Sequence, residues 1–163
     1  MSHGRIILRP MTEAELGARL PALIEGYAED LQRAGRASAA TARTESERQL
    51  VDMLPNGIAT PDTLLLVAED GGQPVGWIWL SLPTPANGRD TAWVYNVEVD
   101  ADRRGRGYGR AIMRAAEDEL TERGVTRFAL NVFGDNPVAI GLYESLGFRV
   151  TQLQMAKTVS PRS

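Results

Sequence analysis

A glycine-rich turn joins an expected strand to an expected helix within residues 97–110, which read VEVDADRRGRGYGR. Gly105, Gly107 and Gly109 leave the backbone N–H groups of this turn uncovered by side chains. The helix that follows directs the partial positive charge of its N-terminus to the same place. A strand, a turn and a helix in this order are therefore suited to binding a phosphate or pyrophosphate group.

Two widespread phosphate-binding motifs do not fit this turn. A dinucleotide fingerprint, G-x-G-x-x-G, that began at Gly105 would need a third glycine where Arg110 stands. A Walker loop needs a Gly-Lys pair, and the sequence contains none. The turn alone leaves three interpretations open: a phosphate site of another kind, an Arg/Gly contact to nucleic acid, or a simple reversal of the chain.

A second segment, residues 136–148, reads NPVAIGLYESLGF and predicts a short helix. Asn136 is a favourable N-cap, and Pro137 suits the first helical position. Gly147 stands where a residue in the left-handed conformation would end the helix.

Together the two segments resemble the signatures of the GCN5-related N-acetyltransferase (GNAT) family. Arg104-x-x-Gly107-x-Gly109 is similar to its R/Q-x-x-G-x-G/A motif, and residues 136–148 match N-x-x-A-x-x-L-Y-x-x-L-G-F at every lettered position. The resemblance implies an α/β (α+β) fold, with a central mixed, mostly antiparallel sheet of about six to seven strands and about four to five flanking helices. We expect one domain over residues 1–163.

Hydrophobic periodicity and chain breakers divide the sequence into elements. The expected strands are Arg5–Arg9, Thr63–Ala68, Val75–Leu82, Trp93–Val99, Phe128–Phe133 and Phe148–Lys157. The expected helices begin at a Thr12–Glu15 capping box, then cover Pro21–Ala34, Ala39–Leu54 and Tyr108–Arg123, and a last one follows Asn136. Only residues 149–163 follow the Gly-Phe pair, so the terminal hairpin usual in the family is shortened or missing.

Composition excludes several classes of function. A net charge of −3 argues against general attraction to nucleic acid. The chain has no cysteine, and its one histidine, His3, stands near the N-terminus, so neither a thiol nucleophile, a histidine-based triad nor a metal site is expected. The longest aliphatic run, Leu64–Ala68, is too short to span a membrane, and no signal peptide is visible. We expect a cytoplasmic protein.

The resemblance implies acetyl-CoA as co-substrate. Its acetyl and pantetheine groups would lie along Val97, Glu98 and Val99, with the Val99 N–H polarising the thioester carbonyl. The residues implied to bind the pyrophosphate are Arg104, Gly105, Arg106, Gly107, Tyr108, Gly109 and Arg110. Asn131, Asn136 and Tyr143 complete the implied coenzyme contacts.

Two residues are candidate catalytic groups. Glu98 is the candidate general base, and an outward-facing strand glutamate is the alternative. Many relatives carry a glutamate on the next strand as the general base, and this chain has Asn131 there. The favoured bases are therefore Glu98 or a water held by Asn131 and Asn96. Tyr143 stands at the position of the family's general acid, and packing of its ring is the alternative.

The amine acceptor is less constrained by the sequence. The cluster Glu25, Tyr27, Glu29 and Asp30 suits a cationic amine or simply a solvated helix face, and the latter is favoured. Trp77, Trp79 and Trp93 suit an apolar acceptor site, although core packing is the preferred interpretation.

The sequence therefore predicts an N-acetyltransferase that moves an acetyl group from acetyl-CoA to a primary amine of a small molecule or peptide by direct transfer. An acyl-CoA-binding sensor or scaffold without activity is the alternative within the family. We expect no nucleic-acid or membrane partner, and a homodimer is compatible with the family but is not specified by the sequence.

Overall fold

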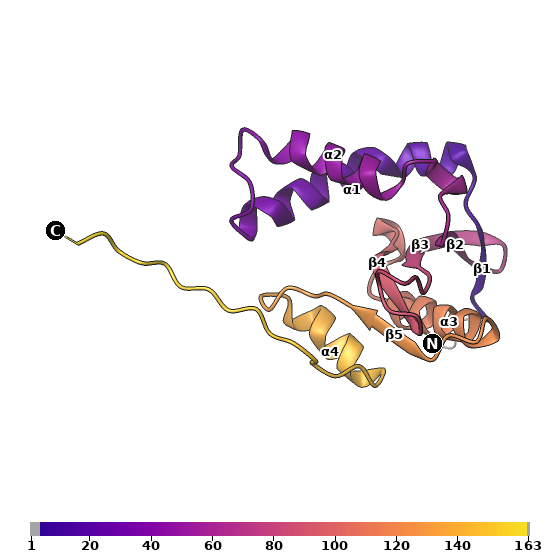
Figure 1. The fold of residues 1–163 in the computed structure, drawn as a ribbon. Helices are drawn as coiled ribbons and strands as arrows, with labels where there is room; N and C mark the ends of the chain where they lie inside the picture. Colours follow the sequence, from indigo (N-terminus) through magenta and orange to yellow (C-terminus); the bar gives the residue numbers. More distant parts are fainter. Residues whose placement is uncertain (1–3, 163) are drawn as a thin grey trace. The chain divides into compact units, whose positions relative to one another are not determined.

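The computed structural model describes residues 4–162, so His3 lies outside the described residues. The chain divides into two compact units, with the boundary between Leu130 and Asn131, and each unit is described by itself. The first unit contains β1 (Ile7–Pro10), α1 (Glu13–Arg33), α2 (Ala42–Met53), η1 (Gly57–Ala59), β2 (Thr63–Asp70), β3 (Gln73–Ser81), β4 (Thr91–Val99), η2 (Ala101–Arg103), α3 (Tyr108–Glu122) and β5 (Arg127–Leu130) (Figure 1). The second unit contains α4 (Pro137–Ser145).

The five strands of the first unit form one sheet in the order β1-β2-β3-β4-β5. The first three neighbouring pairs are antiparallel, whereas β4 and β5 are parallel and are connected through α3. Gly71 and Gly72, both with positive φ, close the β2–β3 hairpin predicted from the sequence. The mixed, mostly antiparallel sheet is confirmed, and within residues 4–162 it has five strands instead of the expected six to seven.

Alternation along the strands separates two apolar faces. Leu65, Val67, Trp77 and Trp79 pack with residues of α1 and α2 in one buried cluster. On the opposite face, α3 contributes Ile112, Met113, Ala116 and Leu120, all buried. Trp77 and Trp79 are 1% and 2% exposed, which confirms core packing as the role of these two rings.

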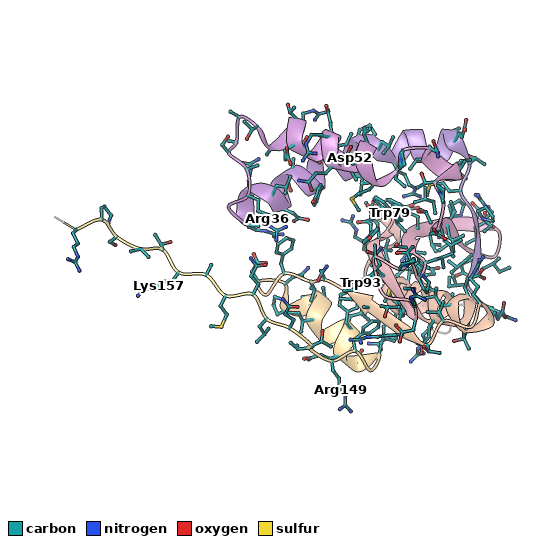
Figure 2. The ribbon with its side chains drawn as sticks, in the orientation of Figure 1. Arg36, Asp52, Trp79, Trp93, Arg149 and Lys157 are labelled. Carbon is teal, nitrogen blue, oxygen red and sulfur yellow. The ribbon has the colours of Figure 1, made fainter. Side chains whose placement is uncertain are left out.

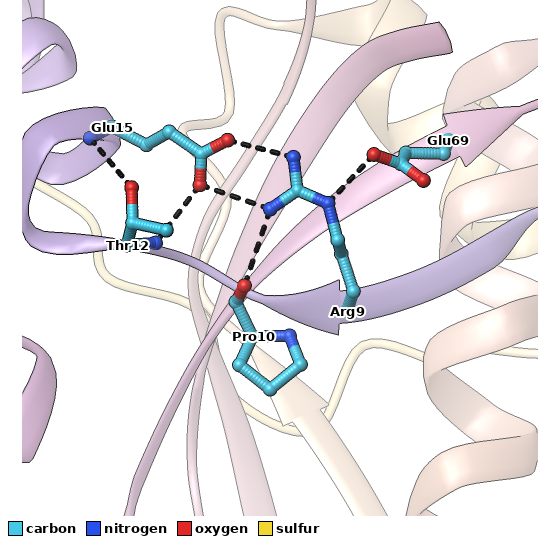
Figure 3. A network of polar contacts seen from close by, with 5 residues as sticks. All are labelled: Arg9, Pro10, Thr12, Glu15 and Glu69. Atoms are coloured by element: carbon cyan, nitrogen blue, oxygen red, sulfur yellow. Dashed lines mark hydrogen bonds and ion pairs between the residues drawn. The ribbon is translucent and has the colours of Figure 1, made fainter. Parts of the chain in front are cut away.

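An ionic network fixes the start of α1 to the sheet (Figure 3). The Arg9 guanidinium donates to both carboxylate oxygens of Glu15, at 2.7 and 3.0 Å, and to Glu69 at 2.6 Å. Glu15 also accepts from the Thr12 N–H, and its own N–H donates to the Thr12 hydroxyl, so the predicted capping box is confirmed. Hydrogen bonding to Arg9 lowers the pKa of Glu15 to about 2.

The first helix is longer than the sequence indicated. Two helical segments divided at Pro21 were expected, but α1 continues through this residue from Glu13 to Arg33. Pro21 lacks the N–H that would bond to the carbonyl of the residue four positions before it. Buried Leu16 on one side of Pro21, and buried Ala28 and Leu31 on the other, hold both halves in one helix, so packing outweighs the missing bond.

The second unit has the predicted helix but not the predicted strand. The Asn136 side chain accepts from the Ala139 N–H at 3.2 Å, Pro137 opens α4, and Gly147 follows it with φ +94°. A strand over Phe148–Lys157 was expected, and this was wrong: residues 149–162 are exposed and have no regular secondary structure. Their side chains, Arg149 and Lys157 among them, extend from a tail that has no hydrogen-bonded neighbouring strand (Figure 2).

Candidate active site

The glycine-rich turn follows the end of β4 and opens α3, as the sequence predicted. Gly105 and Gly107 have φ values of +73° and +82°, a backbone conformation that residues with a Cβ rarely adopt. A Cβ built on Gly105 would meet no atom within 4 Å, so the space above this part of the turn is open. The first turn of any α-helix has N–H groups without intrahelical partners, and here Gly107 is the N-cap. The turn therefore fits a phosphate group in backbone conformation, in space and in dipole direction.

Tyr108 anchors this turn to the sheet. It is the first residue of α3 and is 6% exposed, and its hydroxyl donates to a carboxylate oxygen of Asp70 at 2.7 Å. Asp70 ends β2, so the hydrogen bond connects the glycine-rich turn to the β2–β3 hairpin. The same hydrogen bond raises the pKa of Tyr108 above its ordinary value. Sequence reasoning missed this contact, because no motif connects two residues that lie 38 positions apart.

The three arginines predicted to contact the coenzyme, Arg104, Arg106 and Arg110, do not share one environment. The Arg104 Nε donates to the Val99 carbonyl at 3.2 Å, which connects the turn to the end of β4. Arg106 and Arg110 instead line a groove between α3 and β1. The structure thus brings Arg104 into contact with Val99. Arg106 and Arg110 lie in a different environment, at the groove.

Strand β4 carries the expected acetyl-binding residues and an irregularity in its pairing. Trp79 is opposite Asn96, but the next residue of β3 is opposite Val94, so Tyr95 is an extra residue, as in a β-bulge. Glu98 is opposite Trp77 and half-buried, on the sheet face that α1 and α2 cover. Val97 and Val99 are also half-buried and point to the opposite face.

Polar groups gather on the face that carries Glu98. The Arg19 guanidinium of α1 lies 5.8 Å from the centre of the Trp77 ring and pairs with Asp100 at 3.0 Å. The indole N–H groups of Trp77 and Trp79 and the amide nitrogen of Asn96 are buried without a hydrogen-bond partner among the described residues. Buried unsatisfied donors are costly, and these three occupy neighbouring positions of β3 and β4, where Trp79 is opposite Asn96 and Trp77 is opposite Glu98.

The remaining predicted site residues belong to the second unit. Asn131 follows β5 and is exposed, and Asn136 caps α4. Tyr143 lies on α4, half-buried, with its ring 5.8 Å from that of Phe148. Burial raises the pKa of the Tyr143 hydroxyl, so it keeps its proton at neutral pH.

Two acidic residues of the α1 cluster, for which a solvated helix face was favoured over an acceptor site, form ion pairs at the surface. Glu25 pairs with Arg43 of α2 at 2.8 Å, and Asp30 pairs with Arg33 at 2.6 Å. Trp93, the third tryptophan considered for an acceptor site, donates its indole N–H to the Asn87 carbonyl at 3.1 Å. These contacts favour a structural role for the cluster and for Trp93.

Two classes of feature are absent over residues 4–162. No group of three or more His, Cys, Asp or Glu side chains there could hold a metal ion. Across the same part of the chain, no helix is both long enough and apolar enough to cross a membrane.

Comparison with known proteins agrees with the fold and with the family resemblance. The sequence model described as Acetyltransferase (GNAT) family matches residues 22–148. The uncharacterized N-acetyltransferase YycN of Bacillus subtilis (strain 168) is 31% identical over 156 residues, covering 93% of this chain and 97% of the relative. A crystal structure of the YycN acetyltransferase from the same species has a TM-score of 0.88 at 29% identity, covering 96% of this chain and 99% of that one. The [ribosomal protein bS18]-alanine N-acetyltransferase of Escherichia coli (strain K12) is 48% identical over 59 residues, which are 36% of this chain and 40% of that relative.

The chain belongs to the acetyltransferase (GNAT) family. The resemblance identified from the glycine-rich turn and from residues 136–148 is confirmed, and the protein is an acyltransferase enzyme.

Proposed function

We propose that the protein transfers the acetyl group of acetyl-CoA directly to a primary amine of a small molecule or peptide. The observation that carries this proposal is the turn between β4 and α3, in which Gly105 and Gly107 are left-handed and Tyr108 is anchored to Asp70. Acetyl-CoA supplies an acetyl group activated as a thioester.

In this proposal the backbone of residues 105–110 holds the pyrophosphate, and Arg104 keeps the turn attached to the end of β4. Val97, Glu98 and Val99 hold the pantetheine and acetyl groups, and the Val99 N–H polarises the thioester carbonyl. Arg106, Gly109, Arg110, Asn131 and Asn136 remain predicted coenzyme contacts. Holding the thioester beside the amine supplies much of the rate of a reaction between two substrates.

The amine must lose a proton before it can attack. A lysine-like ammonium, with a pKa of about 10.4, costs roughly 4–5 kcal/mol to deprotonate at pH 7. Glu98 is the proposed base, acting directly or through a water, and its half-buried position on β4 supports this role. The bulge at Tyr95 interrupts regular pairing three residues before Glu98, as is common beside active sites.

The departing thiolate then takes a proton from Tyr143. The Tyr143 hydroxyl is protonated at neutral pH because the ordinary tyrosine pKa is near 10, and burial raises this pKa, which makes the hydroxyl a weak acid. A thiol with a pKa near 8.5 is already a fair leaving group, so we expect mild assistance from this tyrosine.

The acceptor is proposed only as a class. The relative from E. coli acts, by its name, on an alanine of a ribosomal protein, which supports an amine of a peptide as one member of that class. The single domain, the cytoplasmic location and the absence of a metal stay predictions.

A thermal-shift titration with acetyl-CoA, followed by an assay of coenzyme A release over a panel of amines, tests the proposal. We expect stabilisation by acetyl-CoA and release that depends on the amine. Stabilisation without release for any small-molecule or peptide amine would favour the silent acyl-CoA-binding alternative, and a lack of stabilisation would contradict the proposed site.

A further inference from the structure

A groove of about 730 Å³ lies between β1 and the outer side of α3. One wall is residues 4–8, and β1 is an edge strand whose single partner among the described strands is β2. The other wall is a stripe of α3, in which Ala111 and Ala115 leave room beside longer side chains. The groove does not include β4 or the residues proposed for catalysis, and at one end it reaches Arg106, Gly107 and Arg110, which are predicted coenzyme contacts.

The charges on this stripe run in an unusual order. Arg110, Arg114, Asp118 and Glu122 follow one another at intervals of four residues and therefore share one face of α3. Helices are stabilised by acidic residues in the first turn and basic residues in the last, and α3 has neither. Among the described residues, none of these four side chains forms an ion pair with another residue. This charge order does not stabilise the helix itself, and it is complementary to the same charge pattern in the reverse direction.

The neighbouring strand edge is available for pairing. The Met11 N–H donates to the Leu65 carbonyl, on the β2 side, and alternation then directs the N–H and C=O of Leu8 away from β2. Ile7 is 59% exposed on this edge strand. An exposed edge with unpaired backbone groups is a template for another strand.

We propose that two copies of this chain associate across this groove, with their β1 strands paired antiparallel about a two-fold axis. The axis passes near Ile7 and extends the five strands of each copy into one continuous sheet. The two α3 helices then lie antiparallel on the same face of that sheet. The reversed order places Arg114 of one copy opposite Asp118 of the other, and Arg110 opposite Glu122.

Self-complementarity favours a second copy over other occupants. When two such helices lie antiparallel, the arginines of each face the carboxylates of the other, and a two-fold interface requires a surface that is complementary to itself in this way. A polyanion would be repelled by Asp118 and Glu122, and a polycation by Arg110 and Arg114. Small Ala111 and Ala115 permit the close approach of a second helix.

Single charge reversals and their mixture test the proposal. By sedimentation velocity, we expect the wild type to approach twice the 17.8 kDa of one chain as its concentration rises, more weakly at high salt. Arg114→Asp and Asp118→Arg should each shift the protein to the single-chain mass, because each places like charges across the axis twice. An equimolar mixture should recover the doubled mass, because both contacts of the mixed pair are then complementary.

The mixture distinguishes repulsion between two copies from damage to the helix within one copy, because mixing cannot change contacts inside a chain. Circular dichroism melts of both variants establish that each is folded before mixing, and the double variant Arg114→Asp/Asp118→Arg should form the doubled mass alone. A wild type that stays at 17.8 kDa would overturn the proposal. Single variants that remain dimers, or a mixture of single-chain variants that does not associate, would overturn it equally.

Discussion

The contact between Tyr108 and Asp70 permits a sharp test of how the glycine-rich turn is held. Tyr108→Phe removes one hydroxyl and keeps the buried ring, which is 6% exposed. A hydrogen bond to a charged group contributes about 1.5–3 kcal/mol to stability. Asp70 is half-buried, so water can partly replace the lost donor, and we expect a loss near the lower end, about 1.5 kcal/mol. For a chain of this size the loss corresponds to a fall of roughly 3–6 °C in Tm.

Urea unfolding followed by circular dichroism measures this loss, with an unchanged m-value expected because the fold is the same. Tyr95→Phe is the matched control: its hydroxyl accepts from Asn87 at 3.3 Å, and the residue is 41% exposed. We expect the control to change stability by less than about 0.5 kcal/mol. Equal effects of the two substitutions would refute the proposed anchor.

The pH dependence supplies a second readout of the same contact. The pKa of Tyr108 is raised in the folded chain, so its contribution is complete below the ordinary tyrosine pKa of 10.0 and is lost as pH rises through the folded value. The difference between wild type and Tyr108→Phe should therefore shrink in strongly alkaline solution. A difference that grows with pH would have the wrong sign.

Two further substitutions test the catalytic and structural assignments. Tyr143→Phe should keep coenzyme A affinity and lower kcat by roughly 10²-fold, the lower end of the range for acid–base groups, because the thiolate is already a fair leaving group. Turnover assays and coenzyme A titrations measure the two quantities, and unchanged turnover would discard the acid role. Glu15→Gln should destabilise the chain by about 1 kcal/mol at pH 7, because it weakens a partly exposed ion pair with Arg9. The pKa of Glu15 is lowered to about 2 from 4.5, so this difference should be complete above pH 4.5 and vanish as pH falls toward 2. Urea titrations across that range would contradict the assignment if the difference persisted at the acid end.

Local signals predicted the elements around the glycine-rich turn well. Alternation placed β4, the turn placed the start of α3 at Tyr108, and Asn136 with Pro137 placed the start of α4. Each of these depends on residues close together in the chain, where capping and backbone conformation act. Agreement was therefore best where neighbouring residues decide the structure.

Features that depend on residues far apart in the chain were harder to predict from the sequence. Pro21 suggested a helix boundary, yet burial of Leu16 and Leu31 on either side keeps α1 continuous. The alternating tail after Phe148 had the pattern of a strand, but a strand also requires a neighbour to bond with. The Tyr108 contact to Asp70 and the groove beside Arg110 arise from packing of α3 against the sheet, which no local pattern encodes.

The central claim is that the backbone of the turn between β4 and α3 binds the pyrophosphate of coenzyme A. Calorimetric titration of coenzyme A into the wild type and Gly107→Glu tests it directly, with Gly124→Glu as the control. Gly107 and Gly124 have φ values of +82° and +77°, so both substitutions impose similar backbone strain and the same charge. The account predicts that coenzyme A binds the wild type and Gly124→Glu and that pantetheine, which lacks the pyrophosphate, binds far more weakly. It also predicts that folded Gly107→Glu does not bind coenzyme A, and binding of coenzyme A by this variant with wild-type affinity would contradict the account.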